Sequence, residues 1–463
     1  MKALSPILKL RQVIFYGFMC IAVTPLVSYS QKSNISLFDG KTFKGWKKVG
    51  GDAPFTIQDE MIVGEMTKGT PNTFLVTEKQ YGDFILELEI KLEGTETNSG
   101  IQIRSHIDST SHASRRWMYG KQVEVDPTPR AWTGGIYDEA RRRWLYPLDL
   151  NEQAKSAYKT NAFNKVRIEA IGSVTKTWIN GIPVAHLIDT IDRQGHIALQ
   201  VHSIPAHLHG AKVYFKNIRF QTENLKPQEF PKAIYVVNLT PNQLSSTEKN
   251  QGVELLFNGH DAQGWRSARS MQFPEKGWTI QDGQLRVEKS DGAESTNGGD
   301  IISTARYEAF DLSFEFKLTP GANSGVKYFV TLKEETVGSA IGLEYQILDD
   351  KNHPDAKAGR EGNRTLASLY DLIKANKPDR AINPIGQWNR GRIVVTPDNK
   401  VTHYLNGEKV LEYVRGSQEF KDLVALSKYK DWDKFGLAQN GHILLQDHGD
   451  EVTFRSIKIK KLK

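Results

Sequence analysis

Two short segments of the sequence place carboxylates beside carboxamides with the two-residue period of a β-strand. In residues 120–126, Gln122, Glu124 and Asp126 alternate with valines. In residues 343–349, Glu344 and Gln346 alternate with apolar side chains. Because successive side chains of a strand point to opposite faces, each segment predicts a half-buried strand whose polar face carries acid and amide groups. The solvated outer face of an ordinary antiparallel sheet would show the same alternation.

A second pair of polar strands adds an imidazole to each set. Gln200 and His202 share one face of a predicted strand, and Gln446 and His448 share one face of another. If these strands neighbour the acid-bearing ones, each histidine comes close to a carboxylate. A carboxylate sets the tautomer of an imidazole and raises its basicity, which suits general acid–base catalysis near neutral pH. The plainer interpretation is a polar sheet face on which neighbouring groups satisfy the histidine.

The two sets lie in two copies of one unit. Motifs of the first half return in the same order in the second half, so the pairing is collinear. The period is far too long for a solenoid, and the sequence therefore predicts tandem domains. The paired motifs are residues 36–46 with 255–265, 56–59 with 279–282, 98–100 with 323–325, 178–181 with 404–407, 195–202 with 441–448, and 213–218 with 452–457.

Each copy has the pattern of β-structure. Residues 84–92 and 310–318 alternate apolar with polar or charged side chains. Asn180-Gly181 and Asn406-Gly407 separate apolar runs, and this dipeptide favours the tight primed turn of a β-hairpin. Many short strands with such turns predict an all-β fold of two tandem β-sandwich domains. Further strands are expected at residues 166–170 and 392–396, and short helices at 150–158 and 422–429.

The first thirty residues have the pattern of a secretory signal peptide. Basic residues precede an apolar run over residues 13–27, and small residues follow before Gln31. The run is shorter than the roughly 20 apolar residues of a membrane span. We therefore expect a secreted or periplasmic protein that has no membrane association once the signal is removed. The expected boundaries are a signal peptide at residues 1–30, a first sandwich at 31–223, a linker at 224–251 and a second sandwich at 252–463.

The linker is indicated by its composition. Residues 224–251 contain three prolines and a polar run at 245–250 that cannot build a core. An edge strand at residues 233–237 that docks on one domain is the alternative.

Cysteine content and charge exclude several classes of protein. The only cysteine, Cys20, lies in the predicted signal peptide, so the mature chain has no disulfide, zinc–thiolate site or cysteine nucleophile. Lipid attachment at Cys20 is the alternative to simple cleavage. Removing the three basic residues of the signal peptide lowers the formal net charge from +7 by three, to +4, and no basic stripe suggests a nucleic-acid partner. Nucleotide-binding fingerprints, the G-x-S-x-G elbow and the P-loop are also missing from the sequence.

Metal binding has only weak support in the sequence. His202, His207 and His209 are spaced so that they could share an ion, because imidazole suits zinc, copper or nickel. Only the first of them has a counterpart in the second copy. A calcium site at Asp126 or Asp349 lacks the twelve-residue loop pattern. We expect no cofactor, with a divalent cation as the alternative.

Aromatic residues are the other candidates for ligand contacts. An aromatic ring can pack on the apolar face of a sugar while amides, carboxylates and guanidinium groups bind its hydroxyls. Core packing is the plainer interpretation for several of them, and it is our expectation for Trp46 and Trp265. The candidates are Trp117, Tyr119, Trp132, Tyr137, Trp144 and Tyr146 with Arg130, Arg141 and Arg142, and in the second copy Tyr345, Tyr370 and Trp388.

Together, these motifs resemble the 3-keto-disaccharide hydrolase domain, and the resemblance covers nearly all of the mature chain in two copies. It implies a concanavalin A-like (laminin G-like) jelly-roll sandwich, secretion by a bacterium that degrades glycosides, and a small carbohydrate substrate oxidised to a ketone at carbon 3. The motifs are residues 37–40, 45–46, 98–100, 134–137, 178–181 and 199–202 in the first copy, and 323–325, 343–346, 369–371, 386–389 and 445–449 in the second.

The resemblance implies cleavage by β-elimination. A C3 ketone acidifies the hydrogen on C2, so a base removes that proton, the C1 substituent leaves, and water can add afterwards. This needs a base, an acid for the leaving oxygen and a donor for the enolate oxygen. The expected catalytic residues are Glu124, His202, Glu344 and His448. The expected substrate-binding residues are Arg104, Gln122, Asp126, Tyr137, Gln200, Lys327, Gln346, Tyr370 and Gln446, with Arg104 or Lys327 at the oxyanion.

The copies differ at these positions, and two other functions remain open. The carboxylate and amide exchange places between the copies, and Arg104 aligns with Phe329 while Gln102 aligns with Lys327. The two sites could therefore take different substrates, or one could only bind. One alternative function is a non-catalytic, lectin-like carbohydrate-binding protein. The other is an ordinary glycosidase, which needs two carboxylates about 5–10 Å apart across one groove.

Overall fold

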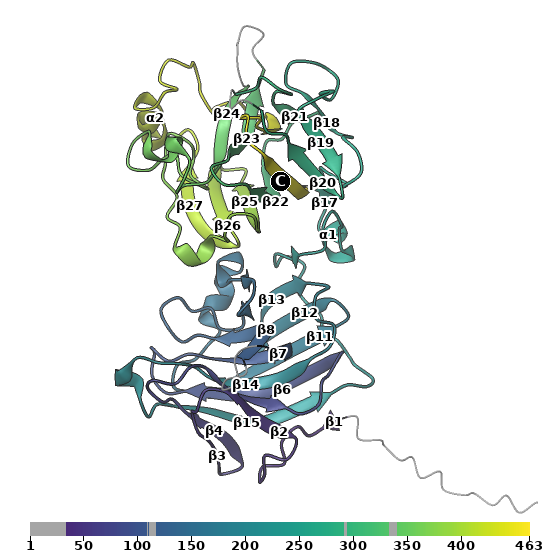
Figure 1. The fold of residues 1–463 in the computed structure, drawn as a ribbon, viewed down its shortest axis with the longest axis vertical. Helices are drawn as coiled ribbons and strands as arrows, with labels where there is room; N and C mark the ends of the chain where they lie inside the picture. The colour runs from purple at the N-terminus through teal and green to yellow at the C-terminus, as the bar shows by residue number, and fades with distance from the viewer. Residues whose placement is uncertain (1–33, 109, 111–116, 291–293, 333–339) are drawn as a thin grey trace, which may run out of the picture.

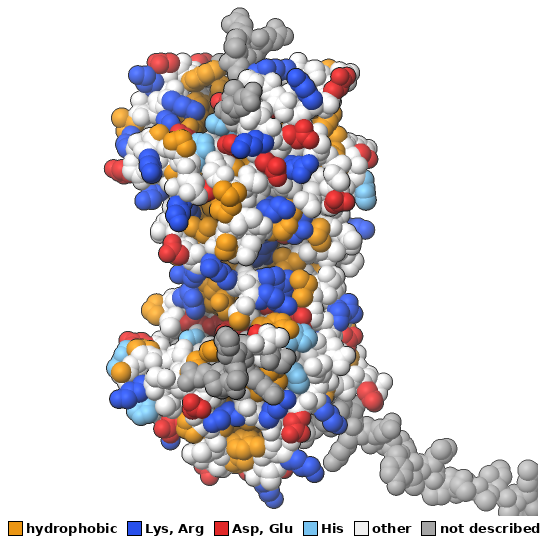
Figure 2. Space-filling view, viewed as in Figure 1, with side chains coloured by type: hydrophobic (Ala, Val, Ile, Leu, Met, Phe, Trp, Pro, Cys, Tyr) orange, Lys and Arg blue, Asp and Glu red, His pale blue; other side chains and the backbone are white. Residues whose placement is uncertain are grey.

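A computed structural model of the chain shows two β-rich halves joined end to end (Figure 1), and the molecule is narrower between them (Figure 2). It describes residues 34–463 except 109, 111–116, 291–293 and 333–339. The predicted signal peptide at residues 1–30, including Cys20, lies outside the described residues. Among the described residues, no helix is both long and apolar enough to span a membrane.

The first half consists of two mainly antiparallel sheets. The nine-stranded sheet has the order β16-β13-β12-β11-β6-β15-β4-β3, and β1 pairs with β15. Its strands are β1 (Asn34–Ile35), β3 (Phe55–Gln58), β4 (Met61–Glu65), β6 (Phe84–Leu92), β11 (Asn164–Ile171), β12 (Val174–Ile179), β13 (Ile182–Ile188), β15 (Lys212–Gln221) and β16 (Val237–Asn238). The seven-stranded sheet has the order β10-β9-β8-β7-β14-β5-β2. Its strands are β2 (Trp46–Gly50), β5 (Thr73–Thr77), β7 (Ser99–Asp108), β8 (Trp117–Val125), β9 (Ile136–Glu139), β10 (Arg143–Tyr146) and β14 (His196–Val201).

The second half repeats this plan with fewer strands. Its eight-stranded sheet has the order β19-β20-β29-β22-β25-β26-β27, and β17 pairs with β29. The strands are β17 (Val253–Leu255), β19 (Trp278–Gln281), β20 (Gln284–Val287), β22 (Phe310–Leu318), β25 (Trp388–Val395), β26 (Lys400–Leu405), β27 (Glu408–Val414) and β29 (Val452–Lys461). The five-stranded sheet has the order β18-β21-β28-β23-β24. Its strands are β18 (Trp265–Ser267), β21 (Ile301–Ser303), β23 (Asn323–Thr331), β24 (Ile341–Leu348) and β28 (His442–Leu445).

The all-β prediction of two sandwiches is confirmed. The alternating segments 84–92 and 310–318 are the strands β6 and β22, whose apolar side chains are buried between the two sheets of each half. Asn180 and Gly181, at φ 51° and 81°, make the tight turn between β12 and β13. Trp46 and Trp265 are core residues, as expected, and the indole nitrogen of each donates to a backbone carbonyl.

The helices are short and lie in connections. Helix α2 (Gln418–Ala425) starts earlier than the predicted 422–429, because Ser417 caps it by accepting a hydrogen bond from the Phe420 N–H. The segment predicted at 150–158 forms a 3₁₀ turn, η2 (Glu152–Ser156). The other helical turns are α1 (Ser246–Asn250), η1 (Leu148–Leu150), η3 (Ala206–Leu208), η4 (Pro354–Lys357) and η5 (Asp379–Ala381).

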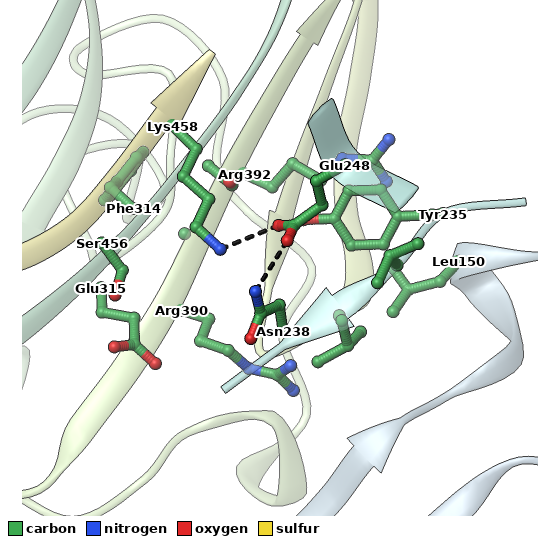
Figure 3. A pocket seen from close by; sticks show the side chains of 15 residues that line it. Leu150, Tyr235, Asn238, Glu248, Phe314, Glu315, Arg390, Arg392, Ser456 and Lys458 are labelled. Carbon is green, nitrogen blue, oxygen red and sulfur yellow. Dashed lines mark hydrogen bonds and ion pairs between the residues drawn. The ribbon is translucent and has the colours of Figure 1, made fainter. Parts of the chain in front are cut away.

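The segment between the two halves packs against both of them. Strand β16 pairs in parallel with β13, so part of the predicted linker extends a sheet of the first half. Helix α1 carries Glu248, whose carboxylate binds Nζ of Lys458 at 2.8 Å and Nδ2 of Asn238 at 2.7 Å (Figure 3). Arg390 of the second half donates to the carbonyl oxygen of Leu145 at 2.9 Å. The cavity at this junction is about 50 Å³, which has room for one or two water molecules but not for a sugar.

Candidate active site

The register of the five-stranded sheet brings the predicted polar residues of the second copy into two adjacent rows. Gly325 on β23 lies opposite Gln346 on β24, and its carbonyl accepts the backbone N–H of Gln446. Two residues further along, Lys327 lies opposite Glu344. Because residues two apart in a strand share a face, these side chains project from the same side of the sheet.

A cavity of about 320 Å³ opens over these two rows. Every residue predicted to form the second site lies on its wall, together with residues that the sequence analysis did not identify. The predicted residues are Lys327, Glu344, Gln346, Tyr370, Gln446 and His448. The additional ones are Glu294, Asn323, Ala340, Ile341, Gly342, Lys428, Tyr429 and Trp432.

Glu344 is the buried acid of this cavity. Its side chain is 4% exposed, and burial raises its pKa, although the charges of Lys327 and Lys428 oppose the shift. Oε2 lies 4.0 Å from Nζ of Lys327. The carboxylate reaches this position because residue 325 is glycine: a Cβ there would lie 2.2 Å from Oε1. A carboxyl group with a raised pKa keeps its proton closer to neutral pH and can act as an acid.

Lys428 adds a second cation that sequence reasoning missed. It follows α2, and its backbone N–H donates to Oδ2 of Asp371 at 2.7 Å. Its Nζ lies 4.4 Å from the ring centre of Tyr370 and 5.2 Å from that of Tyr429. No strand period marks this position, and the only available signal was a lysine beside a tyrosine in a loop that the first copy does not repeat.

His448 lies beside His353 and Asp450. One nitrogen or oxygen atom from each of these three residues lies within 4.8 Å of the others. Among the described residues, this is the only group of three side chains placed so that they could bind a metal ion. However, Nδ1 of His353 accepts a hydrogen bond from the Asp355 N–H, which places the proton of the neutral ring on Nε2. Since Nε2 is the atom that faces Asp450, at 4.0 Å, the tautomer set by this hydrogen bond does not suit a metal ligand.

The first copy assembles the same residue types differently. Gly100 lies opposite Glu124, and Gln102 lies opposite Gln122, so the carboxylate and the amide have exchanged rows relative to the second copy. The side chains form a hydrogen-bonded chain in which Gln102 donates to Gln122 at 3.0 Å and Gln122 donates to Glu124 at 3.0 Å. Asn98 donates to the other oxygen of Glu124 at 2.6 Å.

A second carboxylate, that of Glu139, lies near Glu124 and was not identified by the sequence analysis. Burial and the charge of Glu124 raise the pKa of Glu139 to about 7, and burial also raises the pKa of Glu124. His202 lies close enough to Glu124 to oppose the rise in the pKa of that carboxyl group. Nδ1 of His202 donates to the Ser203 carbonyl at 2.5 Å. Tyr137 is half-buried beside the two acids. Both polar atoms of the Gln200 side chain are buried without a hydrogen-bond partner.

Two predicted contacts in the first copy are corrected by the structure. Arg104 occupies a bulge with φ 48°, and its guanidinium donates to the carbonyls of Gly82, Gly172 and Ala170 and to Asp83, away from Glu124. It is a structural residue, not an oxyanion donor. Asp126 is fully buried, and its oxygens bind Thr128 and Arg130 in the loop after β8, so it is not available to a substrate.

The residues considered for metal sites from the sequence have other partners in the structure. His202 bonds to its neighbour Ser203, and His207 pairs with Glu96 on the surface. Among the described residues, these histidines do not gather into a ligand set. Asp349 uses its oxygens to bind the backbone of Gly321 and Lys351 and the side chain of Asn352. Several aromatic candidates, Trp132, Trp144, Tyr146 and Tyr345, are core residues.

Both halves match one family model, described as the 3-keto-alpha-glucoside-1,2-lyase-like domain, over residues 33–221 and 252–460. The chain is also 39% identical over 233 residues to the 3-keto-disaccharide hydrolase of Bacteroides thetaiotaomicron, an alignment that covers 46% of this chain and 79% of that protein. A solved structure of a candidate glycosyl hydrolase from Parabacteroides distasonis is 30% identical, with a TM-score of 0.43, and covers 48% of this chain and 100% of its own. A second one from the same organism is 25% identical, with a TM-score of 0.34, and covers 45% of this chain and 99% of its own. The chain belongs to the 3-keto-alpha-glucoside-1,2-lyase-like domain family and carries two copies of its domain.

Proposed function

We propose that the protein is a carbohydrate-active enzyme that cleaves glycosides oxidised to a ketone at C3, and that the cavity of the second copy is its catalytic centre. The observation that carries this proposal is the convergence of Glu344, His448, Lys327 and Lys428 on one cavity of about 320 Å³. These groups can supply the base, the acid and the cation that β-elimination requires. The family to which the chain belongs supports the keto-sugar substrate.

The roles follow from the surroundings of each group. His448 is the base that takes the C2 proton, because its imidazole lines the cavity and an imidazole nitrogen can accept a proton. Glu344, whose raised pKa favours the protonated carboxyl, donates to the C1 oxygen as it leaves. Lys327 stabilises negative charge that develops on the C3 oxygen. Asn323, Gln346 and Gln446 bind the sugar hydroxyls. No cofactor takes part in this mechanism.

The aromatic side chains and the volume of the cavity favour a small sugar as the substrate. Tyr370, Tyr429 and Trp432 give the cavity an apolar wall against which a pyranose ring can pack. The volume is at the lower end of the range of small-molecule sites, so a monosaccharide or disaccharide fits better than a polymer. We also propose export through the N-terminal signal, with cleavage near residue 30.

The site assignment is tested by two matched histidine variants. His448→Ala should abolish most aglycone release from a 3-keto-glucoside, whereas His202→Ala should retain it, because His202 belongs to the first copy. Rates are measured with a chromogenic 3-keto-glucoside, and melting temperatures confirm that both variants are folded. Loss of activity only in His202→Ala would move the catalytic centre to the first copy.

A further inference from the structure

Lys428 differs from the other lysine of the cavity in what surrounds it. Its side chain is exposed and lines the cavity, and its backbone is fixed by the hydrogen bond to Asp371. The rings of Tyr370 and Tyr429 flank its Nζ at 4.4 and 5.2 Å. Lys428 is therefore held at the cavity by aromatic faces, and its exposed surface is open to a molecule in the cavity.

The two lysines have different charged neighbours. Lys327 lies 4.0 Å from Glu344, and its charge opposes the burial that raises the pKa of Asp300 to about 6. Lys327 thus lies near two acidic side chains. Removal of water by the surrounding protein lowers the pKa of Lys428, and the charges of Lys327 and Arg364 act in the same direction. Glu344 and Glu294 oppose that shift without reversing it.

We propose that Lys428 is a nucleophile that forms a covalent imine with the C3 ketone of the substrate. This inference rests on the proposed function, because it requires a carbonyl group in the bound sugar. A lysine amine becomes reactive toward a carbonyl when it lies beside another cation. The cation near Lys428 is Lys327, which lines the same cavity.

The covalent route balances in atoms and electrons. The Nζ lone pair attacks C3, the carbonyl oxygen takes one proton from Nζ and one from solvent and leaves as water, and an iminium forms. His448 takes the C2 proton, and the C2–H electrons form the C2–C3 double bond of an enamine. The enamine electrons then form the C1–C2 double bond and expel the C1 oxygen, which takes a proton from Glu344, and the iminium is restored. One water adds across C1 and C2, and a second hydrolyses the iminium, so one water is consumed overall.

The imine also explains why oxidation of the sugar would control cleavage. An unoxidised glycoside has a hydroxyl at C3 and cannot react with an amine. A ketone makes the covalent bond possible, and the positive nitrogen then acidifies the C2 hydrogen more than the neutral carbonyl does. The sugar class that Lys428 selects is therefore a 3-keto-glycoside with a free C2 hydrogen.

The test is reductive trapping. Wild-type protein is incubated with a 3-keto-glucoside and cyanoborohydride, which reduces an iminium to a stable amine. Intact mass should show one sugar-derived adduct per chain, and peptide mapping should place it on Lys428. The unoxidised parent glucoside should give no adduct. Lys428→Arg, which keeps the charge but cannot form an imine, should give none, and Lys430→Arg, an exposed neighbour, should behave like wild type.

Rates complete the test. Lys428→Arg should lower kcat for aglycone release by about 100-fold or more, with an unchanged melting temperature. Aglycone release by the wild type without any trapped adduct would overturn the imine and leave the proposed cleavage standing, as would an active Lys428→Arg. A trapped adduct at Lys428 without aglycone release would support the imine and overturn the cleavage.

Discussion

Lys327 lies directly opposite Glu344 on neighbouring strands, with Nζ 4.0 Å from Oε2, at a place where the first copy has two glutamines. Gln102 and Gln122 hydrogen-bond to each other at 3.0 Å in that copy. The same row of the sheet thus carries a lysine and a carboxyl group in one half and a pair of amides in the other. This difference is the basis for placing the chemistry in the second copy.

Replacement of the buried acid should remove the proton donor. Glu344→Gln should lower kcat by roughly 10²–10⁴-fold, because an amide cannot protonate the leaving oxygen. In the wild type, activity should also fall as the pH rises above the raised pKa of Glu344, since the carboxyl then loses its proton. The measurement is aglycone release between pH 5 and 9. Glu412→Gln, on the surface, is the matched control, and an active Glu344→Gln variant would remove this residue from the mechanism.

A single methyl group at residue 325 should displace the acid. The Cβ of Gly325→Ala would lie 2.2 Å from Oε1 of Glu344, so the carboxylate must move away from its place over the strand. We expect a kcat reduced by about 100-fold, since misplacement by about 1 Å has effects of this size. Gly82→Ala is the control, because a Cβ there meets its nearest heavy atom at 3.6 Å. Equal rates for the two variants would contradict the position of Glu344.

The two acids of the first copy should make stability depend on pH. The pKa of Glu139 is raised from 4.5 to about 7 in the folded protein, so between these values the folded state holds a proton that the unfolded state has lost. The free energy of unfolding therefore falls as the pH rises through this window. Glu139→Gln removes the charge and should be more stable than wild type by roughly 1–3 kcal/mol at pH 8, with the difference vanishing near pH 4. Urea denaturation at both pH values measures this, and an equal or lower stability of the variant at pH 8 would refute the raised pKa of Glu139.

Removal of metal ions should leave catalysis unchanged. The hydrogen bond from the Asp355 N–H to Nδ1 of His353 sets a tautomer that does not suit a metal at the trio with His448 and Asp450. Dialysis against a chelator should therefore leave the rate of aglycone release as it was. Metal content of the dialysed protein is measured in parallel. Loss of activity that a divalent cation restores would show that an ion takes part.

The regular part of the site could be predicted because it follows the strand period. Glu344 and Gln346 were found by alternation, since both lie on β24 and share a face. Gln446 and His448 line the cavity but follow β28, which ends at Leu445. The expected pairing of the histidine strands with the acid-bearing strands is wrong, because β7 lies between β14 and β8, and β23 lies between β28 and β24. Local pattern and sheet geometry therefore agree at Glu344 and Gln346.

The irregular part could not be predicted from the strand period. The prediction that Arg104 contacts the substrate fails because a bulge at this residue, with φ 48°, interrupts the alternation. The bulge turns the Arg104 side chain away from the acids. The apolar counterpart Phe329, at φ 53°, was the signal that this position faces inward. Lys428 and Glu294 come from loops, where nothing in the local sequence fixes the direction of a side chain.

The most direct measurement is aglycone release by the wild-type protein from a 3-keto-glucoside and from its unoxidised parent under identical conditions. We predict release from the keto form only. Cleavage of the parent at a comparable rate would indicate an ordinary glycosidase that uses Glu294 and Glu344, and binding of both sugars without cleavage of either would indicate a lectin. Either result would contradict the keto-sugar chemistry proposed for the second copy.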